Sequence, residues 1–285
     1  MVTVLLVFSG LMIMLYILSR GKYSDIVDSI DKKACPIKGM LPVGLYMLDL
    51  FKYSYNTTYD RKLITAIKEL HGPGKAVLML RVHWGGKLSW MLLSLLFAFF
   101  VGTLSEPDAG YAIFCILLPV VIFYISDREL FEKVKKRRLA IQLDFPDFVN
   151  KLTLLINAGM TVSKAWERTS ASDRQTPLYM ELASSVQNIR SGMAEHKAYE
   201  EFAKRCHVPV ITRFITVILQ NIRKGNAELV PILRVFANEC WEIRKNTAKK
   251  YGEEASTKML LPMMLMFIAI LLIVGMPAVL ALKCI

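Results

Sequence analysis

The sequence has few of the residues from which catalytic and metal-binding sites are built. Its four histidines have no partner at the spacing of a metal site or a catalytic triad: His71, His83, His196 and His207. The five cysteines are scattered along the chain: Cys35, Cys115, Cys206, Cys240 and Cys284. This spacing favours neither a disulfide framework nor a zinc site. We therefore expect no catalytic residues, no metal and no cofactor.

A nucleotide-binding loop is also missing. Such a loop places glycines around the phosphate, followed by Lys and then Ser or Thr. The nearest candidate, Gly72-Pro73-Gly74-Lys75-Ala76, lacks the first glycine and has alanine where a hydroxyl must contact magnesium. A break between two helices is the better interpretation of this segment.

Charged residues are absent from four long apolar stretches of a chain in which 54% of residues are hydrophobic. Each stretch holds roughly 17 to 24 residues, enough to cross a hydrocarbon core of about 30 Å as a helix. The four predicted spans are Val2–Ser19, Leu88–Leu104, Gly110–Ser126 and Met259–Leu282. The first lacks a positively charged start and a small-residue cleavage site, so we interpret it as a retained anchor. A channel or transporter usually carries ionisable residues within its spans, and their absence disfavours that class.

Basic residues are concentrated in the two long segments between the predicted spans. The net charge is +12, yet the only charged residues of the short turn 105–109 between the second and third spans are acidic, Glu106 and Asp108. Because Lys and Arg stay on the cytoplasmic side of membrane proteins, we expect both long segments to be cytoplasmic and both termini to lie outside. Topology accounts for the positive charge, so no nucleic acid partner is expected.

A basic run directly after the third span is the strongest local charge signal: Lys133, Lys135, Lys136, Arg137 and Arg138. Two interpretations of this run stay open. It sets the topology and attracts anionic lipid, at about 1 kcal/mol per basic residue near the surface. Alternatively, it is a docking edge for an acidic soluble partner.

The segment from Leu130 to Lys258 is predicted to be helical throughout, because its apolar positions recur with a period near 3.6. We expect a bundle of about six helices, at 145–156, 161–171, 177–189, 194–206, 208–223 and from 229 onward. Turns are expected at Gly159, Gly192 and Gly225. If the sixth helix continues through Lys258 into the last span, a stiff rod would deliver a push on the bundle to the membrane.

The predicted fold class is therefore all-α, a polytopic membrane protein with four transmembrane helices and one cytoplasmic bundle. Its five regions are the first transmembrane helix (1–19), a cytoplasmic N-terminal segment (20–87), a transmembrane hairpin (88–126), the bundle (127–258) and a fourth transmembrane helix with the C-terminus (259–285). Within the second region, residues 20–58 suit a loop or a segment at the bilayer surface. Helices are expected over 61–70 and from Lys75 into the second span.

The order of several short motifs carries a resemblance to a known family. They are Phe145-Pro146-Asp147, Asn157 to Val162 with Ala165, Pro177-Leu178 with Glu181-Leu182, Ile189 with Gly192, Phe202-Ala203, Gly225 before Leu229 and Leu233, and Glu254-Ala255 with Lys258 to Pro262. Residues 142–282 resemble the type II secretion system F domain, most closely in the Tad (tight adherence, Flp pilus) platform proteins of the TadC branch. Residues 20–87 match no part of that pattern and are too short for a second copy of the bundle, which favours the single-domain Tad form.

This resemblance implies a non-enzymatic platform protein of the inner membrane, at the base of a pilus or secretion machine. Its implied partners are a hexameric secretion ATPase, a related TadB-like platform subunit, pilin subunits and membrane lipids, in a homo- or hetero-oligomer. A membrane-anchored adaptor without a motor is a second hypothesis, and a transporter or channel component is a third.

Overall fold

A computed structural model describes residues 2–23, 26, 39–104, 109–172, 174–222 and 226–283. Every regular element in these ranges is a helix, as the sequence predicts. The chain divides into two compact units, Met1–Arg138 (unit 1) and Leu139–Ile285 (unit 2). One long helix, α6 (Ala109–Asn157), contributes its first part to unit 1 and its last part to unit 2.

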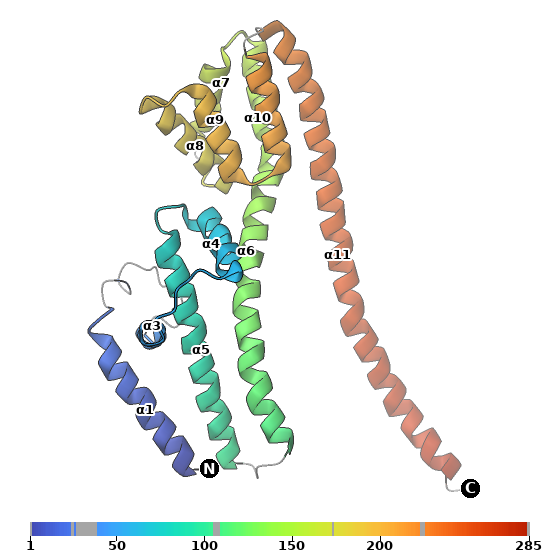
Figure 1. Ribbon diagram of the computed structural model, residues 1–285. Coiled ribbons are helices and arrows are strands. Elements are labelled where there is room, and N and C mark those ends of the chain that lie inside the picture. Colours follow the sequence, from blue (N-terminus) through green and yellow to red (C-terminus); the bar gives the residue numbers. More distant parts are fainter. Residues whose placement is uncertain are drawn as a thin grey trace. The chain divides into compact units, whose positions relative to one another are not determined.

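Unit 1 is built on helices that lie side by side: α1 (Val2–Arg20), α5 (Ala76–Leu104) and the first part of α6 (Figure 1). Phe8 of α1 packs on Phe99 of α5, with ring centroids 5.4 Å apart. Tyr111 of α6 donates its hydroxyl to the carbonyl oxygen of Ala98 at 2.9 Å. As the sequence predicts, α5 runs without interruption from just after Lys75 through the second predicted span.

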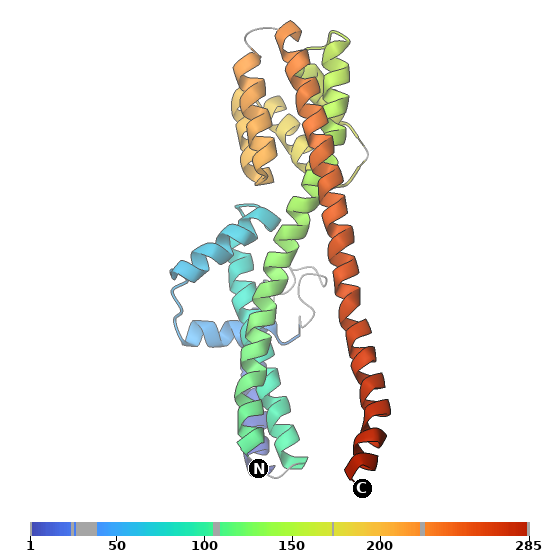
Figure 2. The ribbon, with the colours of Figure 1, turned by 90° about the vertical axis from the view of Figure 1, so that its right-hand side faces the viewer.

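A short helix, α3 (Leu41–Leu50), occupies part of the segment whose shape the sequence left open. It is seen end-on in Figure 1 and lengthwise in Figure 2, so it lies across the direction of α1 and α5. Leu41, Leu45 and Leu48 bury one side of α3 in a cluster with Val82 of α5. The sequence does not predict this helix, because its ten mostly apolar residues, which include Pro42 and Asp49, carry no clear helical period.

Helix α4 (Thr58–His71) begins with a capping box, in which the backbone N–H of Thr57 donates to the Asp60 carboxylate at 3.1 Å. It ends at Gly72, whose φ of +79° few side chains tolerate. The predicted helix over 61–70 is therefore confirmed, and residues 72–75 form the break between α4 and α5. Leu63 and Ile67 pack against Leu80 of α5.

Unit 2 consists of helices packed around aromatic side chains. Its elements are the end of α6, α7 (Val162–Ser170), α8 (Pro177–Arg190), α9 (Glu195–Cys206), α10 (Pro209–Asn221) and α11 (Asn226–Lys283). Trp166 is fully buried, and its ring centroid lies 4.6 Å from Tyr199 and 5.2 Å from Phe202. Its indole N–H donates to Ser185 Oγ at 2.9 Å, so its one polar group is satisfied.

Among the residues that the structure describes, two helices are long and apolar enough to cross a membrane, within Ala76–Thr103 of α5 and Leu229–Gly275 of α11. They contain the second predicted span and most of the fourth. The first predicted span forms α1, whose described apolar part, Leu5–Ser19, is shorter. The third forms the beginning of α6. Membrane crossing by these two helices stays a prediction.

Candidate functional site

In unit 2, α6 and α8 are each followed closely by a glycine, Gly159 and Gly192, whose backbone has a positive φ. Gly159 has φ +92°, and its N–H donates to the Ile156 carbonyl at 3.0 Å. Gly192 has φ +94° and donates in the same way to Ile189 at 3.0 Å. Both are αL caps that satisfy carbonyls at the end of a helix. The third turn residue of the sequence analysis, Gly225, lies outside the described residues.

The start of α11 is part of the core of unit 2. Phe236 lies among the aromatic side chains, with its ring centroid 5.3 Å from that of Phe214. Polar contacts on the surface reinforce this packing: Asp147 of α6 accepts from Arg244 of α11 at 3.0 Å, and Arg213 of α10 pairs with Glu239 of α11. A force on the bundle therefore acts directly on α11.

Beyond this core, α11 continues as a single helix. Every residue from Met259 to Val274 is exposed, and most of them are large and apolar. No break occurs at Pro262, although proline removes one helical hydrogen bond. In water such a surface would be unfavourable, whereas lipid tails or apolar helices of a partner would cover it. The stiff rod predicted from the sequence requires the sixth bundle helix to continue through Lys258 into the last apolar stretch, and α11 does so.

The basic run is divided between two environments. Arg138 donates two hydrogen bonds to the buried carboxylate of Glu69 on α4, both at 2.7 Å, and Arg137 lies 4.0 Å from the same carboxylate. Lys133 pairs with Glu129 one turn away at 2.7 Å. Lys135 and Lys136 are exposed. The two arginines thus tie α6 to α4, while the lysines remain on the surface.

A buried polar cluster in unit 1 was not anticipated from the sequence. Asp127 of α6 pairs with Lys87 of α5, whose side chain is fully buried, and accepts the hydroxyl hydrogen of Tyr59 of α4. His83 Nε2 lies 3.1 Å from Asp127 Oδ1. We call Tyr59, His83, Lys87 and Asp127 the Asp127 cluster. It brings together α4, α5 and α6.

Aromatic rings surround the ammonium group of this cluster. Lys87 Nζ lies 4.4 Å from the ring centroid of Phe123 and 4.8 Å from that of Trp84. Rings at this distance stabilise a cation that has left water. The signal that would have found the pair is its placement: Lys87 directly precedes the second predicted span and Asp127 directly follows the third, at the same end of an antiparallel hairpin.

The Asp127 cluster keeps its carboxylate charged. Burial by itself raises the pKa of Asp127, but hydrogen bonds from Lys87, Tyr59 and His83 outweigh burial and hold that pKa below its usual value. Burial and the hydrogen bond to Asp127 raise the pKa of Tyr59, so its hydroxyl remains a donor. The arrangement is that of a stable buried ion pair that fixes helices in register.

The apolar part of α5 begins at Ala76, earlier than the predicted span at Leu88, and therefore also includes Arg81. Arg81 donates to Asp49 of α3 at 3.0 Å. The charged groups at this end of α5 are thus paired with carboxylates of neighbouring helices. The described residues hold no cluster of three or more His, Cys, Asp or Glu suited to a metal ion.

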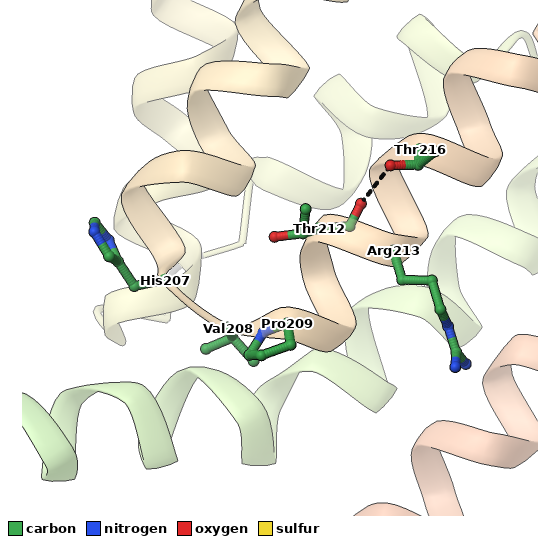
Figure 3. Close-up of a pocket in the computed structure, with 6 residues that line it drawn as sticks. All are labelled: His207, Val208, Pro209, Thr212, Arg213 and Thr216. Carbon is green, nitrogen blue, oxygen red and sulfur yellow. Dashed lines mark hydrogen bonds between the residues drawn. The ribbon is translucent and has the colours of Figure 1, made fainter.

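Two of the hollows on the surface of unit 2 lie among its shorter helices. One, of about 550 Å³, lies where α9 ends and α10 begins, and is lined by His207, Val208, Pro209, Thr212, Arg213 and Thr216 (Figure 3). The Thr216 hydroxyl donates to the Thr212 carbonyl at 3.0 Å and is used within the helix. The other hollow, of about 270 Å³, lies beside α7 and α8 and contains the Arg190–Glu167 ion pair. Both offer contact surfaces rather than reactive groups.

A family model matches one part of this chain. Residues 148–277 match the family model of type II secretion system (T2SS) protein F. The match supports the F family. It begins near the end of α6, includes α7 to α10 and follows α11 into its apolar part, so it covers less than half of the chain and none of unit 1. We call residues 148–277 the F-type domain. No curated protein and no solved structure matches the chain.

Proposed function

We propose that this protein is an inner-membrane platform of a pilus-assembly or secretion machine, in the single-domain Tad form. The F-type domain supports the general class, a membrane platform of secretion or pilus machinery. The Tad assignment rests on the single F-type domain and on the motifs from Phe145 to Pro262. In this role the protein is not an enzyme, has large cytoplasmic segments and contacts lipid, a related platform subunit and pilins.

The observation that carries the proposal is the continuity of α11. This helix begins at Asn226, joins the F-type core at Leu229 and reaches Lys283 without a break. Because α11 is one continuous helix, movement of the core displaces the apolar end as well. A hexameric ATPase that pushes or rotates the F-type domain would thereby move a membrane helix beside the pilins.

Site-specific photo-crosslinking in cells that make the machine tests this proposal. A photoreactive amino acid at Leu154, Met180 or Thr212 is exposed on the F-type domain, and one at Ile270 is exposed on the apolar end of α11. We expect at least one of the first three positions to capture the ATPase. The position at Ile270 should capture membrane proteins and no ATPase.

The adaptor hypothesis makes a different prediction for the same experiment. Capture of soluble proteins without any ATPase, from cells shown to be assembling fibres, would contradict the platform and support an adaptor. The pairing of Arg81 and Lys87 with carboxylates gives no independent support to a transporter.

A further inference from the structure

Helices α3 and α5 approach each other closely at Gly44 and Gly85. A Cβ atom added at Gly44 of α3 would overlap the carbonyl oxygen of Gly85 and lie 2.7 Å from Ser89 Oγ. Ser89 in turn donates its hydroxyl to the Met40 carbonyl at 2.8 Å. Backbone therefore meets backbone, and α3 is held at one level along α5, from Gly85 to Ser89.

That level coincides with the start of the charge-free part of α5. The predicted span begins at Leu88, and the charged residues of α5, Arg81 and Lys87, precede it. Since α3 lies across α5 (Figures 1 and 2), a bilayer crossed by α5 has α3 parallel to its surface at this depth. Helices that lie in the interface have this orientation.

Aromatic side chains with polar tips gather at the same level. Trp84 Nε1 donates to Asp60 at 2.9 Å, and Tyr53 donates its hydroxyl to the same carboxylate at 2.9 Å. Tyr23 donates to Asp49 at the end of α3. Tyrosine and tryptophan are enriched where a membrane protein passes from hydrocarbon to water, because their rings are apolar and their tips polar.

The end of α3 presents an apolar surface that the described residues of unit 1 leave exposed. Leu50 and Phe51 are 64% and 72% exposed, and Lys52 follows directly with a positive φ of 46°. Two large apolar side chains beside an exposed ammonium group match the boundary between acyl chains and anionic headgroups. We propose that α3, through Leu50 and Phe51, lies in the lipid interface on the cytoplasmic side and sets the depth of α5 in the membrane.

This assignment gives α3 a mechanical role. Moving α5 along its axis by one turn, about 5.4 Å, would carry α3 with it through the Gly44–Gly85 contact. Leu50 and Phe51 would then leave the interface for water or for the hydrocarbon core. The helix acts as a depth stop for unit 1 while α11 moves. The inference rests on the proposal that α5 crosses the membrane.

Nitroxide depth measurements on the full-length chain in phosphatidylethanolamine–phosphatidylglycerol vesicles test the inference. Single labels at Leu50→Cys and Phe51→Cys are compared with labels at Phe97→Cys on the apolar part of α5 and at Lys135→Cys on the basic run. Cys35, Cys115 and Cys284 are replaced, whereas Cys206 and Cys240 are buried and serve as an unlabelled background.

We expect the labels at Leu50 and Phe51 to report a depth near the lipid phosphates. The Phe97 label should lie in the hydrocarbon, where oxygen is concentrated, and the Lys135 label should be accessible to a water-soluble nickel chelate. Nickel access at Leu50 and Phe51 equal to that at Lys135 would overturn the inference while leaving α5 in the membrane. If the labels at Leu50 and Phe51 were protected from both oxygen and the nickel chelate, a protein partner would cover them, and this result would also overturn the inference. Nickel access at Phe97 would instead show that α5 does not cross the membrane. Failure of the interface inference and failure of the predicted span therefore give different results.

A second variant tests the depth stop. Replacing both apolar side chains, Leu50→Ser with Phe51→Ser, leaves the buried face of α3 intact and should shift the depth of the Phe97 label. The control, Thr65→Ser on the exposed face of α4, should leave that depth unchanged. An unchanged depth in the double variant would show that α3 does not position α5.

Discussion

The two units hold their helices together in different ways. In unit 2 the helices meet at buried aromatic side chains such as Trp166, whereas in unit 1 buried charges, those of Lys87 and Glu69, are added to the apolar contacts. Aromatic burial is a large favourable term. A buried ion pair adds little net stability, but its partners tolerate few alternative arrangements. We infer that packing stabilises unit 2 and that paired charges set the register of unit 1.

The largest expected effect is at the centre of unit 2. Trp166→Ala leaves a cavity among Phe148, Tyr199 and Phe202 and should lower the free energy of unfolding by about 3 to 5 kcal/mol. Denaturant unfolding of the full-length protein in detergent, followed by the reaction of the buried thiols of Cys206 and Cys240, measures it. The control is Trp241→Ala, whose side chain is 45% exposed. Equal effects of the two changes would contradict a core organised around Trp166.

Lys87→Met should be nearly as severe, but for an electrostatic reason. It leaves Asp127 buried without its ammonium partner, and breaking a buried pair costs about 3 to 5 kcal/mol. The double variant Lys87→Met with Asp127→Leu should recover much of that loss, because neither charge is then buried. The matched control, Lys133→Met, breaks an exposed pair with Glu129 and should cost under about 1 kcal/mol. A double variant as unstable as the single would contradict a register held by charge.

Acid should weaken the Asp127 cluster only at low pH. The pKa of Asp127 lies below its usual value in the folded protein, so its contribution to stability is fully present above an unfolded pKa of about 3.9. The contribution is lost as the pH falls through the folded pKa. The thermal midpoints of the natural protein and of Asp127→Asn should therefore differ at pH 7 and converge below about pH 4. A constant difference down to pH 3 would contradict this.

A smaller effect is expected at the turn after α6. No atom lies within 4 Å of a Cβ built at Gly159, so Gly159→Val is opposed only by the φ of +92°. The cost for an L-residue in this region is about 1 to 2 kcal/mol. Gly252→Val makes the same chemical change at an open helical position with an ordinary φ and should cost nothing. An unfolding midpoint unchanged by Gly159→Val would show that the turn rearranges freely.

Local patterns made much of the fold predictable. The period of the apolar residues, Thr161 as an N-cap and Pro177 in a first helical turn located α7 and α8, and Gly72 marked the end of α4. These signals act within a few residues of the chain, so one sequence is enough to find them.

Contacts between distant segments were not predictable in the same way. Asp127 meets Lys87 across 40 positions, and Arg138 meets Glu69 across 69. The residues next to Arg138 in the sequence do not distinguish a buried carboxylate partner from water, so the basic run looked like a uniform surface. Helix α3 was missed because its burial comes from α5 rather than from its own pattern.

The smallest expected effect separates the lysines of the basic run from its arginines. Lys135→Ser with Lys136→Ser removes two exposed charges and should change the free energy of unfolding by less than about 0.5 kcal/mol. Arg138→Ser removes one charge but leaves the Glu69 carboxylate, which is fully buried, without its bidentate partner, so its cost should be several times larger. Unfolding of both variants in detergent gives this comparison, and equal costs would contradict the division of the run. Because the lysine pair leaves the fold intact, a loss of ATPase crosslinking in that variant alone would then identify docking rather than folding as the role of Lys135 and Lys136.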